Sequence, residues 1–434
     1  MGGPLTDVDD ALGAGDFRAA SIALHPLLGY PEGLTAWRPL LDRFARMCDG
    51  IAGPDLGDKA RAVADEQDAR HLQALYSLGF DLIEHGLPEF AATFLARACE
   101  IEPEHPELVA ELCAALEDSH LNAEAVRWLE RSPAARQGSF LLRYLLAWNA
   151  VMSGDLARAG NELPILAAAD SDERAMQQRI SGIVTRADTI ATASPLDGRD
   201  LRGWHFAING SVLLHTSPYG RDEGMNGRYA LIQDNEALCH EALVRLRHAL
   251  NSLDMQPAAI LTLSDSDSAA LGAAAATFLR VPARRLADAP ESSGLIVAYD
   301  LEYIGDEELS YLESHRPGQM LWSHASQWTR RHPIAADLVS YLYQVNMPPW
   351  GERLFHFESE STRTLPPDTS PPEVRATRVL EAVVEPGALD DLVALDRLAR
   401  AAATLTGEHA AGVLCSHGTR RAQFCGGPVK SNQF

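Results

Sequence analysis

Residues 71–106, HLQALYSLGFDLIEHGLPEFAATFLARACEIEPEHP, decide the fold of the first part of the chain. Their apolar residues recur in two runs at the three- and four-residue spacing of an amphipathic helix. Gly86 ends the first run and Pro103 follows the second, as expected for two helices joined by a short turn. Gly79 and Ala91 are small enough to let these helices approach closely. The stretch therefore predicts a helical hairpin.

The same stretch resembles one tetratricopeptide (TPR) repeat, a helix–turn–helix unit of about 34 residues. The resemblance is carried by Leu75, Leu78, Gly79, Leu82, Ala91, Leu95, Ala98 and Pro103. Weaker copies occupy residues 106–132 and 140–166, and residues 15–20 look like part of another copy. The resemblance implies an α-solenoid of TPR-like helical hairpins over residues 1–190, closed by a helix at 172–192. Such a solenoid implies a protein or peptide partner.

The pattern changes at residues 193–200, ASPLDGRD, which are typical of a linker. Short apolar runs then alternate with helical runs, as in a parallel sheet with crossover helices. Buried strands are expected at residues 258–263, 294–300 and 319–324, and helices at residues 235–253, 268–279 and 306–314. We therefore expect a Rossmann-like α/β domain with a mostly parallel sheet over residues 201–360.

Two local patterns add detail to this second part. Asn209-Gly210 predicts a tight hairpin turn, because both central residues of such a turn need positive φ. A proline-rich run at 365–372 separates a helical extension over residues 374–434. That extension is expected to end in a hairpin of residues 411–415 and 421–425, followed by a mobile tail.

Composition and charge exclude several classes of protein. The 434 residues carry a formal net charge of −23, which would repel a phosphate backbone and disfavours nucleic acid as a partner. No apolar run approaches the length of about 18 residues that a membrane span needs. Residues 1–10 show neither the basic region nor the apolar core of a signal peptide, so we do not expect one there. The 6 cysteines are scattered rather than arranged as a disulfide framework. The expected location is the cytoplasm, with no membrane contact.

Polar residues follow the first expected buried strand, where open α/β sheets bind ligands. They are Ser264, Asp265, Ser266, Asp267 and Ser268, directly before a helix whose N-terminal amides can bind an anion. Asp265 and Asp267 are also candidate ligands, together with Asp300, of a divalent cation. The alternative is a helix N-cap, for which Ser and Asp are favoured.

The order strand, polar loop, helix and second strand over residues 235–330 is similar to the phosphoribosyltransferase fold. The matching stretch is LIVAYDLEYIGD at 295–306, in which Asp300 takes the place of one of the two acids of that family. Bulky Leu301, Tyr303 and Ile304 stand where the family has a small, hydroxyl-rich loop. The resemblance implies a phosphorylated or nucleotide-like ligand, bound by a domain that is degenerate in its catalytic loop.

Three further groups are candidates for chemistry. His324 follows the third expected buried strand and is a catalytic candidate with Asp300; the alternative is a histidine packed between Trp322 and Trp328. Arg221 and Arg228, in the glycine-rich segment 215–229, could bind an anion; the alternative is that this segment is an ordinary structured connection. A zinc site is also open at Cys415, His417 and Cys425, although their spacing matches no paired-cysteine motif.

These patterns support two interpretations of function. The first is a protein-interaction module, in which a TPR-like solenoid is fused to a ligand-binding or catalytically degenerate α/β domain. The second is a metal-assisted enzyme, a transferase or hydrolase acting on a phosphorylated or nucleotide-like substrate. The lack of a complete catalytic motif favours the first, and whether the chain is an enzyme stays open, as do its partner, its substrate and its oligomeric state.

Overall fold

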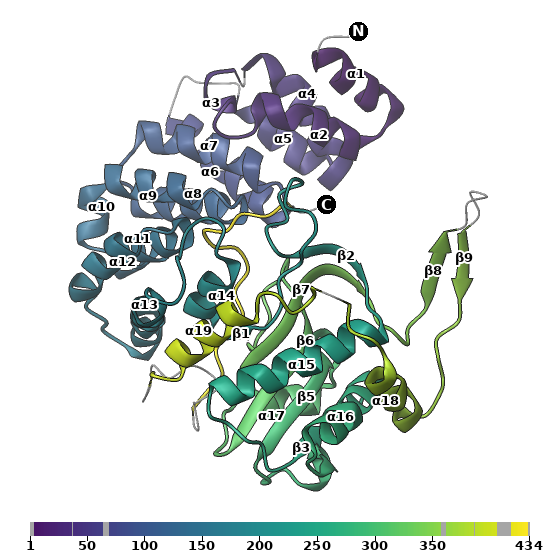
Figure 1. Ribbon diagram of the computed structural model, residues 1–434. Helices are drawn as coiled ribbons and strands as arrows, with labels where there is room; N and C mark the ends of the chain where they lie inside the picture. The colour runs from purple at the N-terminus through teal and green to yellow at the C-terminus, as the bar shows by residue number, and fades with distance from the viewer. Residues whose placement is uncertain are drawn as a thin grey trace. The chain divides into compact units, whose positions relative to one another are not determined.

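A computed structural model gives the fold of residues 4–36, 38–63, 69–356, 362–385, 387–405 and 418–432. The chain divides into two compact units, Met1–Ile180 and Ser181–Phe434, with the division inside helix α13 (Ser171–Ile190) rather than at residues 193–200. The first unit is helical and the second is built on a parallel sheet (Figure 1). Among the described residues, no helix combines the length and apolar character that crossing a membrane requires.

The helical N-terminal unit expected from the sequence is confirmed. Its helices are α1 (Pro4–Ala14), α2 (Phe17–Leu28), α3 (Gly33–Ala36), α4 (Leu41–Ala52), α5 (Pro54–Ala62), α6 (Ala69–Glu84), α7 (Pro88–Ile101), α8 (Pro106–Asp118), α9 (Asn122–Arg131), α10 (Pro133–Gln137), α11 (Phe140–Ser153) and α12 (Leu156–Glu162). Short 3-10 turns lie at η1 (Arg38–Leu40) and η2 (Leu163–Ile165). Most helices pack on the next one in sequence, so the contacts of this unit are mainly local.

Proline and glycine mark the helix boundaries, as the sequence pattern required. Pro88 opens α7 and Pro106 opens α8, because the first helical position needs no N–H donor. Gly86 and Gly154 adopt positive φ values of 71° and 91° in the turns that follow α6 and α11. Residues 71–106 therefore fold as the expected pair α6–α7.

The contact between α6 and α7 depends on Gly79. A Cβ atom added at Gly79 would lie 2.4 Å from Cγ of Leu95, so the close partner of this glycine is Leu95, one turn along α7 from Ala91. Both Ala91 and Leu95 are completely buried. The small residue is needed because a leucine side chain packs directly on the α6 backbone.

The C-terminal unit contains an all-parallel sheet in the order β1-β7-β6-β5-β3-β4, with β2 also paired to β7. Its strands are β1 (Val212–Leu213), β2 (Tyr229–Gln233), β3 (Ile260–Thr262), β4 (Ala283–Arg285), β5 (Gly294–Asp300), β6 (Gln319–Gln327) and β7 (Leu338–Met347). Strands β8 (Arg353–His356) and β9 (Thr362–Leu365) form a separate antiparallel pair. The expected parallel sheet is thus confirmed.

Helices cover one face of this sheet. They are α15 (Glu236–Ser252) and α16 (Ser266–Leu279), on which α18 (Pro372–Glu381) and α19 (Leu392–Ala402) pack (Figure 1). The remaining short helices are α17 (Asp306–Leu312), η3 (Leu286–Asp288) and η4 (Leu301–Tyr303). The predicted hairpin at Asn209-Gly210 is wrong, because Asn209 ends helix α14 (Leu201–Asn209) and Gly210 is its left-handed C-cap.

The last described residues lie along the C-terminal unit. Arg420 forms a completely buried ion pair with Asp337, at 2.8 Å from Nη1 to Oδ1, and Asp337 also accepts the Leu321 N–H at 2.7 Å. Farther on, Val429 is buried and Ser431 donates a hydrogen bond to the Met225 carbonyl at 3.1 Å. Residues 411–415, one half of the expected final hairpin, lie outside the described residues.

We predict that Gly79→Ala destabilises the N-terminal unit by roughly 1–3 kcal/mol, because the new methyl group overlaps Leu95. The matched control is Gly160→Ala in α12, where an added Cβ meets nothing within 4 Å. That control should gain up to about 1 kcal/mol from helix propensity. Thermal melts of both variants test this, and equal stabilities would contradict the tight α6–α7 contact.

Candidate functional site

The polar side chains of the loop after β3 form hydrogen bonds mainly with neighbouring parts of the protein. Asp265 caps α16 by accepting the Ser268 N–H at 2.8 Å, while the Ser268 hydroxyl accepts the Tyr299 N–H at 2.8 Å. The backbone N–H and hydroxyl of Ser264 both donate to Glu308, at 2.8 and 3.0 Å. These contacts match the N-cap alternative for this loop.

Arg375 of α18 covers the start of α16. Its Nη1 donates to the Ser266 hydroxyl at 3.0 Å and to Asp267 Oδ1 at 3.2 Å. Burial raises the pKa of Asp267, and the nearby Arg375 only partly offsets that effect. A buried cation thus already contacts the carboxylate that was a candidate metal ligand.

Asp300 ends β5 and turns toward β7. It accepts hydrogen bonds from the Tyr343 hydroxyl and, at 3.1 Å, from the Glu302 N–H. Burial raises the pKa of Asp300 to about 7, against the lowering effect of these two donors. Because successive strand residues point to opposite faces, Asp300 and Tyr299 face different sides of the sheet.

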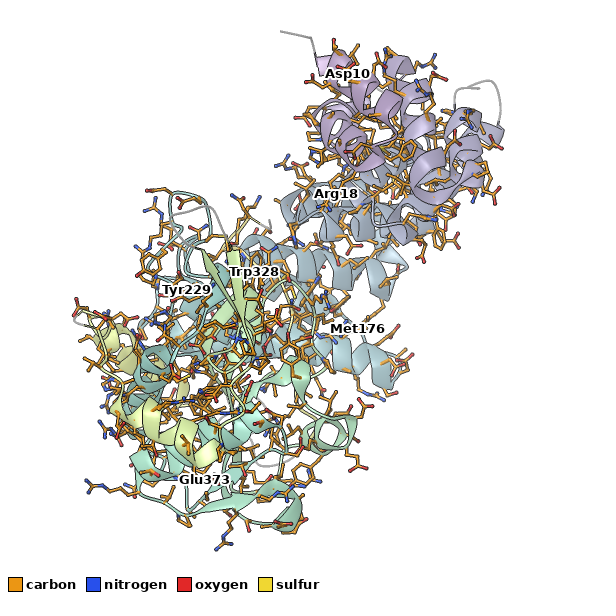
Figure 2. All side chains as sticks on the ribbon, turned by 90° about the vertical axis from the view of Figure 1, so that its right-hand side faces the viewer. Asp10, Arg18, Met176, Tyr229, Trp328 and Glu373 are labelled. Atoms are coloured by element: carbon orange, nitrogen blue, oxygen red, sulfur yellow. The ribbon has the colours of Figure 1, made fainter. Side chains whose placement is uncertain are left out.

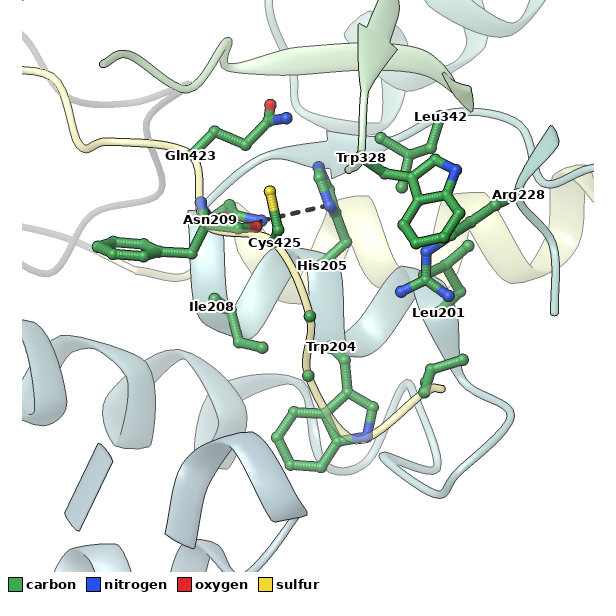
Figure 3. A pocket seen from close by; sticks show the side chains of 14 residues that line it. Leu201, Trp204, His205, Ile208, Asn209, Arg228, Trp328, Leu342, Gln423 and Cys425 are labelled. Atoms are coloured by element: carbon green, nitrogen blue, oxygen red, sulfur yellow. Dashed lines mark hydrogen bonds between the residues drawn. The ribbon is translucent and has the colours of Figure 1, made fainter. Parts of the chain in front are cut away.

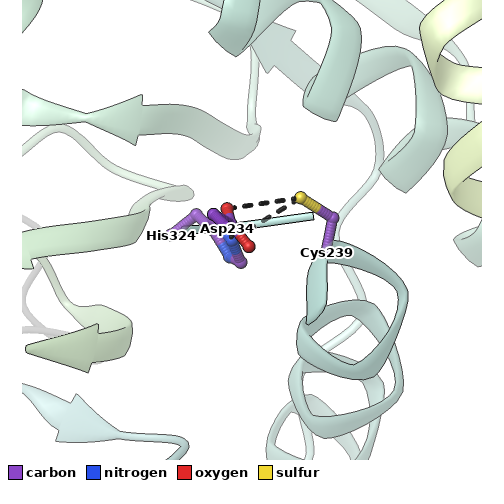
Figure 4. Close-up of side chains that lie close together, drawn as sticks. All are labelled: Asp234, Cys239 and His324. Atoms are coloured by element: carbon purple, nitrogen blue, oxygen red, sulfur yellow. Dashed lines mark hydrogen bonds and ion pairs between the residues drawn. The ribbon is translucent and has the colours of Figure 1, made fainter. Parts of the chain in front are cut away.

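His324 lies in a different polar cluster, which is completely buried. Its Nε2 lies 3.0 Å from Oδ2 of Asp234 and 3.6 Å from Sγ of Cys239, and that Sγ lies 3.6 Å from the same Oδ2 (Figure 4). The Tyr299 hydroxyl donates to this Oδ2 at 2.8 Å. Among the described residues, these three side chains are the one group of His, Cys, Asp or Glu whose ligand atoms lie within 4.8 Å of one another. The structure therefore gathers His324 with Asp234 and Cys239, and it does not bring Asp265, Asp267 and Asp300 together.

The charge states in this cluster follow from burial and hydrogen bonding. Burial alone would raise the pKa of Asp234, but the charge and hydrogen bond of His324 and the Tyr299 hydroxyl outweigh it and hold that pKa below its usual range. Burial and the Asp234 carboxylate raise the pKa of Cys239 well above its usual value. Without a metal, Cys239 is therefore a neutral thiol beside a carboxylate.

A larger pocket opens beside the glycine-rich segment 215–229, which contains Arg221 and Arg228. Its volume is about 670 Å³, and its wall comes from this segment, β2 and the first turns of α15. We call it the loop pocket. It is lined by Ser217, Tyr219, Gly220, Glu223, Met225, Arg228, Tyr229, Ala230, Leu231, Ile232, Gln233, Asn235, Ala237, Leu238, Glu241 and Glu385.

Two residues that line the loop pocket, Tyr229 and Glu241, are joined by the imidazole of His215, which does not itself line the pocket. The Tyr229 hydroxyl lies 2.7 Å from Nε2 of His215, and Nδ1 of His215 lies 3.1 Å from Oε1 of Glu241. The second pair is close enough for an ion pair, although its orientation falls short of a hydrogen bond. Burial would raise the pKa of Glu241, but His215 and Arg245 outweigh it and lower that pKa.

Arg228 links the loop pocket to a small inner cavity of about 20 Å³ (Figure 3). Its guanidinium lies over the ring of Trp328, at 5.1 Å from the ring centroid (Figure 3). The Trp328 indole N–H donates to the Tyr229 carbonyl at 3.4 Å, and both residues are labelled among the side chains of the C-terminal unit in Figure 2. The residue is only 5% exposed, and within the described residues no acceptor bonds its Nε or Nη1. Burial lowers the pKa of Arg228 to about 10, so the side chain stays cationic at neutral pH.

Two other residues of the inner cavity respond to this charge. Burial and the positive charge of Arg228 lower the pKa of His205 to about 3, so His205 is neutral, and its Nε2 also lacks a partner within the described residues. Burial raises the pKa of Cys425 to about 12, although Arg228 opposes the rise. Cys415 and His417, the other members of the possible zinc group, lie outside the described residues.

The two arginines predicted to bind an anion occupy different places. Arg221 is exposed and lines a second surface pocket with Arg199 and Arg397, whereas Arg228 is buried behind the loop pocket. Sequence reasoning named Arg228 and His324 but missed Asp234, Cys239 and Glu241. The signal that could have found the first two is position, because Asp234 directly follows the short apolar run that forms β2, and Cys239 lies in the first turn of the helix expected at residues 235–253.

Comparisons with known proteins add no assignment: no protein-family model, curated protein or solved structure matches this chain.

We predict that Asp300 makes the C-terminal unit less stable as pH rises. The folded pKa of about 7 exceeds the unfolded value of 3.8, so the folded state holds this proton more tightly. Stability should therefore fall by roughly 1–4 kcal/mol between pH 4 and pH 7 and then level off. Asp300→Asn should remove this part of the pH dependence, whereas exposed Asp288→Asn should not. Calorimetry at pH 5 and pH 8 measures it, and an unchanged slope in Asp300→Asn would refute the buried-acid assignment.

Proposed function

We propose that the protein is a binding protein with two parts. The helical unit is a TPR-like α-solenoid that binds a protein or peptide partner. The second unit is a Rossmann-like, phosphoribosyltransferase-like α/β domain that binds a small molecule through an anionic group, such as a phosphate or a carboxylate, in the loop pocket. Catalytic residues in the manner of that family are not required for this role.

Arg228 carries the proposal for the α/β unit. A buried charge is costly unless it is paired, and a guanidinium without a carboxylate partner is therefore rare in a protein interior. A phosphate or carboxylate can accept two parallel hydrogen bonds from such a group. The ring of Trp328 stabilises the guanidinium by a cation–π contact, and Arg228 also lines the loop pocket, where a ligand would meet it.

The other walls of the loop pocket define the remainder of the ligand. The volume of about 670 Å³ lies in the range of small-molecule sites. Leu231, Ile232 and Leu238 supply apolar surface, while Glu223 and Glu385 disfavour a second anionic group. We therefore expect one anionic group near Arg228, attached to a body that carries hydroxyl or amino donors.

The proposal for the helical unit rests on its repeated pairs. Helices α6–α7, α8–α9 and α11–α12 coincide with the three best repeats in the sequence, and each pair is in contact. Stacked pairs of this kind form extended binding surfaces in repeat proteins. No chemistry-bearing cluster of three His, Cys, Asp or Glu lies among the described residues of this unit, which suits a docking role.

An enzyme remains the second candidate because His215 contacts both Tyr229 and Glu241, two residues that line the loop pocket. A histidine held between a hydroxyl and a carboxylate can accept the proton of that hydroxyl. This arrangement would make the unit a transferase or hydrolase on the same ligand. Turnover of a bound ligand, abolished in His215→Gln with binding retained, would favour the enzyme over the binding protein.

We predict that Arg228→Gln abolishes ligand-induced stabilisation in a thermal-shift screen of sugar phosphates, nucleotides and small carboxylic acids. Loss of a hydrogen bond to a charged group is worth about 1.5–3 kcal/mol, or roughly 10- to 150-fold in affinity. Arg221→Gln, which changes an exposed arginine, is the matched control and should keep the shift.

The unliganded variant provides a second measurement. If Arg228 serves ligand binding, removing a buried charge that no carboxylate among the described residues is seen to pair should leave the free protein as stable as wild type or more stable. A ligand that stabilises Arg228→Gln and wild type equally would place binding elsewhere and defeat the proposal.

A further inference from the structure

We propose that Asp234, Cys239 and His324 form a buried transition-metal site, suited to Zn²⁺, that joins β2 and α15 to the central strand β6. The cluster offers one oxygen, one sulfur and one nitrogen from three parts of the chain (Figure 4). All three residue types are zinc ligands. The sulfur excludes Mg²⁺ and Ca²⁺ as natural occupants, because these cations take oxygen ligands.

The separations of the three ligand atoms match a metal site. They are 3.0 Å from nitrogen to oxygen and 3.6 Å from sulfur to each of the other two atoms. A point equidistant from all three lies about 2 Å from each, close to Zn–N and Zn–O bonds of about 2.0–2.2 Å and slightly short of a Zn–S bond of about 2.3 Å. A small outward movement of Cys239 is enough to fit the ion.

The same geometry argues against a catalytic Cys–His–Asp triad. In a triad, the nucleophile and the carboxylate contact different nitrogens of the histidine. Here Cys239 and Asp234 both approach Nε2 of His324, as ligands of one ion do. In addition, the three side chains have no exposed surface, so a substrate has no access to the thiol.

A fourth position remains, since zinc is generally four-coordinate. The Tyr299 hydroxyl lies 2.8 Å from the same carboxylate oxygen and is the candidate for that position or for a hydrogen bond to the ligand. The rings of Tyr299, Trp322 and Tyr341 surround the imidazole at centroid distances of 5.4, 6.1 and 5.0 Å. They fix the orientation of the completely buried His324.

The competing explanation is a hydrogen-bonded hub without metal. Asp234 would accept from the Cys239 thiol, His324 and Tyr299, and the cluster would need no ion. The two explanations differ in metal content and in the response of stability to zinc. A site of this kind takes up its ion during folding, because the ligands meet only in the folded chain.

The test begins with the full-length protein produced in medium supplemented with ZnCl₂ or CoCl₂, followed by elemental analysis. We expect close to one metal ion per chain in wild type and in Cys113→Ala, a control at another completely buried thiol. Cys239→Ala should lose the ion, and the cobalt form of wild type should show thiolate charge-transfer absorption that this variant lacks.

A second measurement keeps the proposal falsifiable if Cys239→Ala folds poorly. Wild-type protein is unfolded with a chelator and refolded with Zn²⁺, with Mg²⁺ or without metal. A melting temperature raised only by Zn²⁺ supports the site. Wild type that contains no stoichiometric metal and melts identically in all three refolded samples would establish the hydrogen-bonded hub instead. Neither outcome depends on Arg228 or on a ligand in the loop pocket.

Discussion

Burial of charged side chains is the constraint on which the C-terminal unit depends. Arg420 pairs with Asp337, which directly precedes β7, and Asp337 in turn accepts a hydrogen bond from the N–H of Leu321 on β6. Arg245 joins Glu241 at 2.6 Å and Asp391 at 2.7 Å. Removing one partner of such a pair leaves an uncompensated charge and costs about 3–5 kcal/mol. These pairs therefore hold Arg420 and Asp391, which lie outside helices and strands, against the rest of the unit.

Because most buried charges of this unit are paired, the exceptions are informative. Arg228 is buried with donors that no described acceptor bonds, and it sits between the loop pocket and a cavity the size of a water molecule. Asp234, by contrast, has many partners, since three side chains approach one of its carboxylate oxygens. The first suggests an external anion, and the second suggests either a shared proton network or an ion at its centre.

The pairing of β7 explains why both features lie near the same end of the sheet. β7 pairs with β6 on one side and with both β1 and β2 on the other. The end of β2 places Asp234 close to His324 of β6, while the segment that leads into β2 carries Arg228. A single long strand thus positions the buried cluster and the loop pocket, although their residues are widely spaced in the sequence.

How far the candidate site could be predicted differs from residue to residue. Arg228 and His324 could be predicted as candidate site residues from their residue types and from the strands and loops expected around them. Asp267 was visible too, but its contact with Arg375 spans 108 positions and could not be foreseen from local pattern. Asp234 and Cys239 could not be predicted as site residues from residue type alone. An acid before a helix usually caps that helix, and a thiol on an apolar helix face is usually part of the core.

The sequence alone determined the helical first unit and the parallel sheet, since both follow from local periodicity and from glycine and proline at the boundaries. Position 209 shows the limit of local rules, because Asn-Gly suits a hairpin as well as a helix C-cap, and the packing of α14 decided between them. Only the tertiary structure decided which polar groups meet. Hydrogen bonds and ion pairs act over a few ångströms in space, and strand order, which local sequence does not encode, sets those distances.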